Sequence, residues 1–480
     1  MSETQYELNV GLEVHVELAT ASKMFCRCKT KFGDPPNTNV CPVCMGLPGA
    51  LPVANEEAVR LGVMAALALN CRVNLSSRFD RKNYFYPDLP KAYQISQFEE
   101  PLAVSGYVEL ASGKRIRIRR LHLEEDAGKS MHAGDDITTA SYSLLDYNRS
   151  GVPLAEIVSE PDISSPEEAR EYLEKMQRTL RFAGVSDVKM EEGSMRVDCN
   201  VSVRRKGEAQ MGVPVELKNL SSFRAVTRAL AYEYDRQSRL IEQGKRIVRE
   251  TRHWDEDKGV TASLRAKESS QDYRYFPDPD LPRLELDEVF IESVQKAMPR
   301  LPNQVVDFYV NVLGLPKYDA EVLTVDPNLV KFFDRCVELG GEPKPVSNWL
   351  MGDIMAYMNA KGLSYDTIPV TPENLVAMLG LIKDGVISGK IAKDVLIKMF
   401  ETGKAPGDIV KEEGLEQVSD DASLSVIVDS VIAANSEVVA QFKAGKDKVL
   451  GFLVGQVMKA SKGRANPAKV NIMLREKILS

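Results

Sequence analysis

The 480-residue sequence has no apolar run long enough to cross a membrane. A membrane-spanning helix needs about 20 consecutive, mostly apolar residues, and charged or polar residues interrupt every apolar stretch sooner. The first residues, Met1–Gln5, have neither the basic and apolar regions of a secretory signal nor the arginines of a transit peptide. We therefore expect a cytoplasmic protein with no membrane segment.

Two common catalytic arrangements are also missing. The chain has only 4 histidines, and none of them lies with a serine or cysteine in a familiar catalytic triad. Asp126–Ser130 resembles the end of a phosphate-binding P-loop, but Leu123 stands where that motif has its first glycine. The sequence therefore shows no triad and excludes a P-loop, so any use of ATP requires another scaffold.

Positive charge is in deficit over the whole chain but not at its end. The net charge is -7, which argues against general coating with nucleic acid. Residues 441–480 are different, because nine Lys or Arg and two Asp or Glu give them a local charge of +7. A predicted helix ends there in a basic turn, and a second begins at Asn466, an arrangement that can bind phosphate. The alternative is a solvated basic helix end favoured by the helix dipole. The candidate phosphate contacts are Lys459, Lys462 and Arg464.

Four of the 7 cysteines form two close pairs. Cys26 and Cys28 are separated by a 12-residue loop from Cys41 and Cys44. Paired thiols on both sides of a loop suit a tetrahedral zinc site, and grouped cysteines in a reducing compartment are more often metal ligands than disulfides. We predict one structural zinc ion away from the chemistry, although the first pair is spaced more closely than in the common zinc ribbon. The alternative is four free thiols.

Two groups of ionisable side chains occur in the N-terminal region. Residues 8–18 alternate strictly between apolar and polar, which predicts a strand with Glu13, His15 and Glu17 on one face. The second group is the run from His122 to Asp126. Carboxylates grouped with imidazoles suit a divalent cation such as Mg²⁺. For the first group the alternative is the solvated face of a strand.

The remaining pattern divides the chain into an α+β part and a helical part. Alternating segments at 106–110, 115–121, 195–203 and 213–217 predict a mostly antiparallel sheet. A capping box at Ser165 predicts a helix that ends near Gly184. From about Phe276 prolines mark a boundary, and amphipathic helical patterns follow. The predicted domains are residues 1–295, an α+β domain that includes the cysteine loop at 26–44, then 296–407, a helical domain, and 408–480, a small helical tail.

Residues 78–94 are dense in cations and aromatic rings, and their apolar residues follow neither the helical period nor the alternation of a strand. Such a loop is suited to grip phosphate and to stack on a base. The alternative is an exposed loop whose aromatic rings pack on the sheet.

Several long segments together carry a family resemblance. They are residues 10–18 (VGLEVHVEL), 79–88 (FDRKNYFYPD), 91–97 (KAYQISQ), 121–129 (LHLEEDAGK), 188–198 (VKMEEGSMRVD), 215–220 (VELKNL) and 451–456 (GFLVGQ). In these segments the chain resembles the B-subunit family of aspartyl/glutamyl-tRNA(Asn/Gln) amidotransferases. The resemblance covers essentially the whole chain.

The resemblance implies a cradle-shaped, mostly antiparallel catalytic domain, a helical domain and a tail that binds tRNA. It also implies the reaction, in which ATP and Mg²⁺ phosphorylate the side-chain carboxylate of a mischarged Glu-tRNA(Gln) or Asp-tRNA(Asn). Ammonia then displaces the phosphate and leaves an amide. The ammonia would come from glutamine hydrolysed by a partner protein, the family's A subunit, and a small C subunit would complete a heterotrimer. Structural zinc is implied as well, since the four cysteines are complete here.

The resemblance further implies roles for single residues. The implied Mg²⁺ ligands are Glu13, His15 and Glu125. Further acidic groups around the metal or the ammonia are Glu124, Asp198 and Glu216. The implied contacts to phosphate or carboxylate are Lys82 and Lys91.

Three other interpretations stay open at this point. The archaeal, Glu-specific E subunit shares the cradle, but it carries a large inserted domain for which 480 residues leave no room. A non-catalytic scaffold that binds tRNA would need only the cysteine loop and the basic tail. A free-standing ATP-grasp-like ligase for a small acid would not need the basic tail. Within the amidotransferase interpretation, either mischarged tRNA, or both, could be the substrate.

Overall fold

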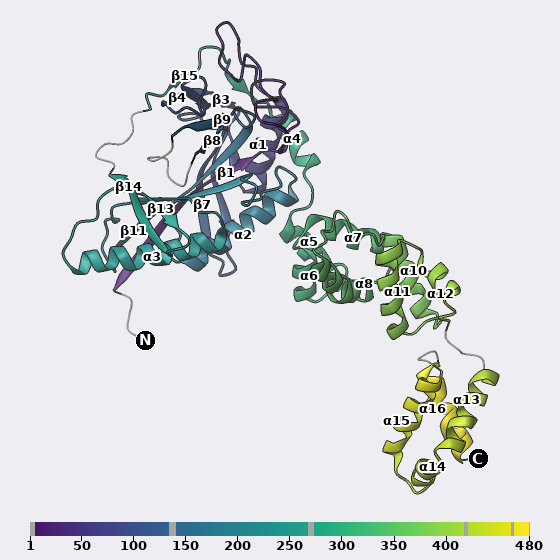
Figure 1. The fold of residues 1–480 in the computed structure, drawn as a ribbon. Helices are drawn as coiled ribbons and strands as arrows, with labels where there is room; N and C mark the ends of the chain where they lie inside the picture. The colour runs from purple at the N-terminus through teal and green to yellow at the C-terminus, as the bar shows by residue number, and fades with distance from the viewer. Residues whose placement is uncertain (1–4, 134–140, 267–272, 417–420, 462–464, 480) are drawn as a thin grey trace. The chain divides into compact units, whose positions relative to one another are not determined.

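The structure is a computed structural model that describes residues 5–133, 141–266, 273–416, 421–461 and 465–479. It divides into two compact units, Met1–Pro302 and Asn303–Ser480 (Figure 1). The first unit contains all the strands found in the described residues, and the regular elements described in the second are all helical. This confirms the predicted α+β class. The finer domain boundaries, at residues 295 and 407, stay predictions.

A nine-stranded sheet dominates the first unit. Its strand order is β14-β13-β12-β11-β1-β10-β7-β6-β2, and its neighbours are antiparallel except for the parallel pair β12 and β13. The mostly antiparallel sheet is therefore confirmed. The strands are β1 (Tyr6–Glu17), β2 (Arg72–Val73), β6 (Ala103–Glu109), β7 (Arg115–Glu125), β10 (Pro153–Ser159), β11 (Met195–Arg205), β12 (Val215–Lys218), β13 (Glu250–Asp255) and β14 (Val260–Ala266).

Short strands form three smaller sheets beside this one, ordered β15-β4-β5, β16-β3 and β8-β9. The segment 78–94, predicted as a loop, forms the strands β4 and part of β5 joined by a loop, so that prediction was only partly right. Backbone pairing to residues near 276 explains the difference, because such a distant partner leaves no trace in the local pattern. The short strands are β3 (Ser76–Ser77), β4 (Asp80–Asn83), β5 (Tyr93–Ser96), β8 (Lys129–His132), β9 (Ser143–Asp146), β15 (Phe276–Pro277) and β16 (Leu284–Glu285).

Helices cover one face of the nine-stranded sheet. Figure 1 shows α2 and α3 along one side of it, with β4, β8, β9 and β15 on the other. The predicted cap is present, since Ser165 Oγ accepts a hydrogen bond of 3.1 Å from the backbone N–H of Glu168. Gly184 follows the helix with φ +72°, a conformation that glycine adopts without strain. The helices of this unit are α1 (Glu56–Ala68), α2 (Pro166–Phe182), α3 (Phe223–Glu242) and α4 (Glu288–Ala297).

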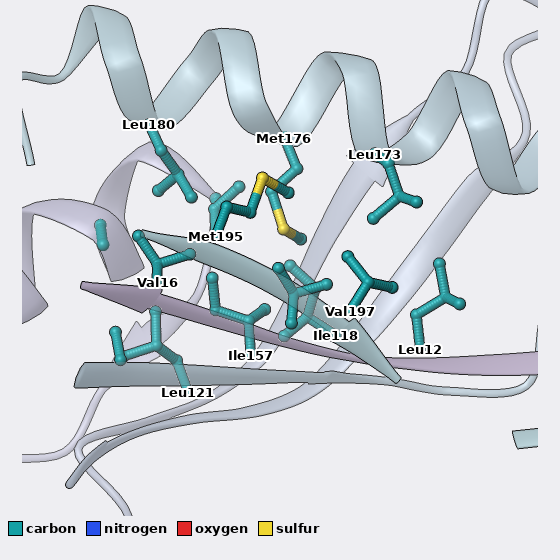
Figure 2. Packing of buried hydrophobic residues seen from close by; sticks show 14 of the residues in the cluster. Leu12, Val16, Ile118, Leu121, Ile157, Leu173, Met176, Leu180, Met195 and Val197 are labelled. Carbon is teal, nitrogen blue, oxygen red and sulfur yellow. The ribbon is translucent and has the colours of Figure 1, made fainter. Parts of the chain in front are cut away.

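The apolar face of α2 holds the core of the first unit together. Figure 2 shows Leu173, Met176 and Leu180 pointing from α2 toward Val16 and Val197 on the sheet. All five side chains are at most 3% exposed. Because side chains alternate along a strand, the residues between the apolar ones on β1 project from the opposite face. That face is free to carry polar groups.

Leu173→Ala should lower the free energy of unfolding of the first unit by about 2–5 kcal/mol, because it removes buried methyl groups and leaves a cavity. The chain has 2 tryptophans, so urea unfolding in a Trp349→Phe background follows the first unit through Trp254 alone. Arg170→Ala on the exposed side of the same helix is the control and should change stability little. An equal effect of the two substitutions would contradict the packing of α2 on the sheet.

The second unit consists of short helices, in agreement with its amphipathic patterns. A π-helical turn at Leu350–Ile354 interrupts the helical run from Pro343 to Lys361, and a 3-10 turn at Asp447–Val449 precedes the helix at Leu450–Ala460. Residues from Leu424 to Ile478 share a hydrophobic cluster of their own. The helices are α5 (Pro302–Asn311), α6 (Lys317–Leu323), α7 (Pro327–Glu338), α8 (Pro343–Trp349), α9 (Met355–Lys361), α10 (Pro372–Lys383), α11 (Gly389–Thr402), α12 (Pro406–Glu412), α13 (Asp421–Ala434), α14 (Ser436–Lys443), α15 (Leu450–Ala460) and α16 (Pro467–Leu479).

Within the described ranges, no single helix has the length and apolar character that crossing a membrane requires. One bent pair, Leu424–Ala434 and Ser436–Lys443, meets these criteria only when its two helices are counted together.

Candidate functional site

A row of polar side chains crosses four central strands of the large sheet. His15 on β1 is in register with Glu156 on β10 and with Arg196 on β11. Glu156 is in turn in register with His122 on β7. Residues directly opposite one another in a sheet project from the same face. Two imidazoles and a carboxylate therefore lie side by side, on the face away from α2.

Glu124, two residues beyond His122 on β7, completes a tight cluster with this row. His15 Nε2 lies 3.4 Å from Glu156 Oε2 and 3.7 Å from Glu124 Oε1. His122 Nε2 lies 3.3 Å from Glu156 Oε2 and 3.7 Å from Glu124 Oε2. One potential ligand atom from each of His15, Glu124 and Glu156 lies within 4.8 Å of the other two. This donor set, two carboxylates and an imidazole, is of the type that binds a divalent cation.

Burial and charge act against each other in the cluster. Burial would lower the pKa of His15, but its hydrogen bond to Glu156 and the charges of Glu156 and Glu124 outweigh that effect and raise it. Burial would likewise lower the pKa of His122, yet the same carboxylates raise it to about 9. The pKa of Glu156 lies well below its usual value, because the two imidazoles overcome the effect of burial. The cluster thus keeps its carboxylates ionised.

The cluster lies in a polar pocket of about 1180 Å³. Lys82 from β4 also lines it, and although burial would lower the pKa of this lysine, the charge of Glu124 contributes to raising it. Aromatic rings form part of the wall, with Phe98 and Tyr275 stacked at 4.1 Å between centroids. Lys82 Nζ is 5.0 Å from the centre of the Tyr273 ring. The pocket therefore combines an ammonium group and aromatic surfaces with the acidic cluster.

A second acidic group lines the same pocket around Glu13. Asn200 Nδ2 donates a hydrogen bond of 2.9 Å to Glu13 Oε1. Burial raises the pKa of Glu13, and the charge of Glu156 adds to the effect. Lys218 Nζ lies 2.5 Å from Asp198 Oδ2 and 3.3 Å from Glu216 Oε1. Six of the predicted site residues line this pocket: Glu13, His15, Lys82, Glu124, Asp198 and Glu216.

Glu125 and Lys91 lie elsewhere. Adjacent residues on a strand point to opposite faces, so Glu125 projects away from Glu124. Its carboxylate pairs with the ammonium of Lys91 and accepts a hydrogen bond of 3.0 Å from the backbone N–H of Ile95. These residues line a separate pocket of about 220 Å³. The structure thus does not bring Glu125 together with His15, as the predicted Mg²⁺ set requires.

The four paired cysteines come together. One sulfur from each of them lies within 4.8 Å of the others, and the Sγ atoms of Cys41 and Cys44 are 3.9 Å apart. Tetrahedral Zn–S bonds of about 2.3 Å require sulfurs roughly 3.8 Å apart. The hydrogen bond from Cys26 lowers the pKa of Cys44 to about 4, which favours the thiolate that binds metal. The residues therefore fit a zinc ion.

Purified, unchelated protein should contain about one equivalent of zinc, because a loop with little core of its own depends on the metal for its order. Cys28→Ser should lose most of it. Cys336→Ser, in the second unit, alters a buried lone thiol and should retain it. Metal analysis by mass spectrometry measures all three proteins. Less than about half an equivalent in the unaltered protein would contradict a zinc site.

The candidate phosphate contacts of the tail are only partly described. Lys459 is exposed near the end of α15. Lys462 and Arg464 lie outside the described residues.

Comparison with known proteins covers both units. Residues 8–292 match the model for the GatB/GatE catalytic domain, and residues 331–478 match the model for the GatB domain. A relative from Moorella thermoacetica is 54% identical over 477 residues, which are 99% of this chain and 100% of that protein. Relatives from Thermoanaerobacter pseudethanolicus and Brevibacillus brevis are 53% and 51% identical, over 99% and 98% of this chain and 99% of each relative. All three are named as the B subunit of aspartyl/glutamyl-tRNA(Asn/Gln) amidotransferase.

This chain belongs to the amidotransferase B-subunit family. The resemblance inferred from the sequence motifs is therefore confirmed over essentially the whole chain. Family membership favours the B subunit over the E subunit, since the chain and these relatives match along nearly their full lengths.

Sequence reasoning on this amidotransferase chain missed several residues of the pocket, among them Glu156, Arg196 and Lys218. Glu156 had a detectable pattern, because it is the single charged residue in the otherwise apolar run 152–158. Arg196 and Lys218 alternate with apolar residues on predicted strands, which is also typical of solvated positions. Only strand register distinguishes a residue that lines the pocket from one that is solvated.

Proposed function

We propose that this chain carries out the ATP-dependent steps of tRNA-dependent amidation. The side-chain carboxylate of Glu-tRNA(Gln) or Asp-tRNA(Asn) is phosphorylated, and ammonia then displaces the phosphate. Activation is needed because a carboxylate is a poor electrophile, whereas an acyl phosphate has a stabilised leaving group. The cluster of His15, Glu124 and Glu156 in a large polar pocket is the observation that carries this proposal. The names of the relatives support the overall reaction.

The donor set suits Mg²⁺. His15, Glu124 and Glu156 would hold the ion, and Glu13 lines the same pocket. We assign Glu156 in place of Glu125, since the Glu125 carboxylate pairs with Lys91 in another pocket. When bound, Mg²⁺ would offset the negative charge that develops during phosphoryl transfer.

The other groups of the pocket suit the substrates. Lys82 keeps its positive charge and would contact the transferred phosphoryl group or the substrate carboxylate. The stacked rings of Phe98 and Tyr275 would exclude water from this side of the pocket. Asp198 and Glu216, both held by Lys218, would orient the ammonia. We keep the phosphate-contacting role for Lys82 rather than Lys91, because Lys91 is already paired with Glu125.

The remaining assignments concern partners. The relatives are named as one of the subunits of an amidotransferase, which supports an enzyme of several chains. Within it, we propose that the A subunit hydrolyses glutamine to supply ammonia, that the heterotrimer is completed by the C subunit, and that the basic tail binds tRNA. This makes the chain part of a carbon–nitrogen ligase with glutamine as the nitrogen donor. Because its substrate is an aminoacyl-tRNA, we place it in the cytoplasm.

The proposed function is tested with the assembled complex and tRNA carrying labelled glutamate or aspartate. Amide formation is expected to require ATP and Mg²⁺, and either glutamine or ammonium ions should serve as nitrogen donor. This chain alone should not hydrolyse glutamine. A complex that binds tRNA but remains fully active with His15→Ala would remove His15 from the proposed site and favour the non-catalytic scaffold. Comparing the two mischarged tRNAs identifies the substrate.

A further inference from the structure

A completely buried lysine connects the cysteine cluster to the rest of the first unit. Lys23 is 0% exposed. Its Nζ lies 3.6 Å from Cys44 Sγ and 3.1 Å from the carbonyl oxygen of Tyr147. Its backbone N–H donates a hydrogen bond of 2.9 Å to the carbonyl oxygen of Cys28. Both the backbone and the side chain of Lys23 therefore contact the cysteine loop.

The position of Lys23 makes sense electrostatically if the cysteines hold zinc. A buried ammonium group is costly unless a negative partner lies near it. Four thiolates on one Zn²⁺ have a net negative charge, and Cys44 is the ligand nearest to this ammonium among the contacts described. Lys23 would thus partly neutralise the metal site from its buried side.

The same loop touches the Lys91–Glu125 ion pair. Cys44, Gly46, Lys91 and Glu125 all line the pocket of about 220 Å³. A Cβ atom at Gly46 would lie only 2.5 Å from Lys91 Cγ and 3.3 Å from Lys91 Cα. The backbone of the loop therefore lies directly against this lysine, with no space for another side chain.

A second glycine marks where the two groups meet. A Cβ atom at Gly151 would lie 3.3 Å from Lys23 Cδ, 3.5 Å from Cys44 Cβ and 3.8 Å from Glu125 Oε2. Lys23, Cys44 and Glu125 thus converge on one point of the backbone. Glu125 adjoins Glu124 of the candidate metal cluster along β7. A displacement of the cysteine loop would reach Lys91 and Glu125 through direct contacts.

We propose that the zinc-binding loop, residues 26–47, positions the Lys91–Glu125 ion pair, and that Lys23 is the positioning residue that joins the loop to it. A consequence for amidation follows only if the reaction uses this ion pair. Only the consequence for amidation rests on the proposed function. The positioning itself can be measured without any activity.

Two glycines, one in the loop and one two residues beyond its end, offer a matched test of the contact. Gly46 and Gly49 both have positive φ, +64° and +84°, so alanine strains the backbone at either position. Only Gly46 has neighbours within 4 Å of an added Cβ. Acetylation of Lys91, whose side chain is 9% exposed, is followed by mass spectrometry of the zinc-loaded protein. Gly46→Ala should raise the rate of Lys91 acetylation several-fold, and Gly49→Ala should leave that rate unchanged. Equal rates in the two variants would overturn the proposed contact.

Lys23→Met tests the link to the metal, with Lys31→Met as its control. Lys31 lies in the same loop, but its side chain is 74% exposed. Replacing Lys23 should weaken zinc binding by about 10- to 100-fold in competition with a chelator, as loss of a group that contacts a metal ligand does. The Lys23 substitution should also raise the acetylation rate of Lys91. Removal of zinc from the unaltered protein by a chelator should raise that rate as well. Lys31→Met should change neither quantity. Unchanged zinc affinity and unchanged acetylation in folded Lys23→Met would overturn the role of Lys23.

Amidation by the assembled complex separates this proposal from the proposed function. If Gly46→Ala raises Lys91 acetylation and lowers kcat, the loop positions a pair that the reaction uses. If acetylation rises while kcat stays unchanged, the positioning is supported and the ion pair has no part in amidation. The zinc and acetylation measurements stand in either case, and they keep the proposal testable even if Lys23→Met fails to fold.

Discussion

Glu156→Gln should lower the rate of ATP-dependent amidation by about 10²- to 10⁴-fold, the effect of losing several kcal/mol of charge stabilisation in phosphoryl transfer. The amide keeps the shape of the side chain but lacks the charge that pairs with His15 and His122. Binding of tRNA should be nearly unchanged, because affinity for nucleic acid comes mostly from phosphate contacts. Single-turnover transfer of the γ-phosphate to mischarged tRNA measures the chemical step.

Two matched substitutions locate the effect. Glu125→Gln removes a carboxylate from the separate pocket, so it should leave the affinity for Mn²⁺, used in place of Mg²⁺, unchanged whatever it does to turnover. Glu156→Gln should weaken Mn²⁺ binding at least about tenfold. Glu160→Gln, which alters a surface pair with Arg119, should affect neither quantity. If Glu125→Gln weakens Mn²⁺ binding and Glu156→Gln does not, the assignment of Glu156 is wrong.

Replacing Lys459, Lys462 and Arg464 together by glutamine should weaken tRNA binding and flatten its dependence on salt. Each phosphate contact contributes about 0.9 to the slope of log K against log salt concentration, so three contacts contribute up to about 2.7. Amidation at saturating tRNA should survive, because the candidate metal cluster belongs to the first unit. Fluorescence titration of tRNA at several salt concentrations measures the slope.

The tail itself provides the control for this experiment. Lys443, Lys446 and Lys448 are exposed, and replacing them by glutamine changes the net charge by the same amount as the first triple substitution. A general electrostatic effect of the tail would lower the slope equally in both triple variants. Direct contacts at 459–464 would lower it more in the first. An unaltered slope in both would leave the basic tail as ordinary solvated surface.

Several elements of the fold could be predicted because their causes are local. The alternation at 8–18 predicts β1 and the face that carries Glu13 and His15, and the cap at Ser165 predicts where α2 begins. The same alternation within 121–126 places Glu124 with His122 and turns Glu125 toward the side of Leu121 and Leu123.

The sequence by itself determined the α+β class, the family, the strand face that carries His15 and the four cysteines that come together. These follow from periodicity, spacing and long motifs, all of which are contained in contiguous segments. Only the tertiary structure decided that Glu156 stands between His15 and His122, because strand register joins Glu156 to residues 141 and 34 positions earlier in the chain. It alone also placed Gly46 against Lys91, since a contact between two segments outside regular structure depends on how the chain packs and not on any period within it.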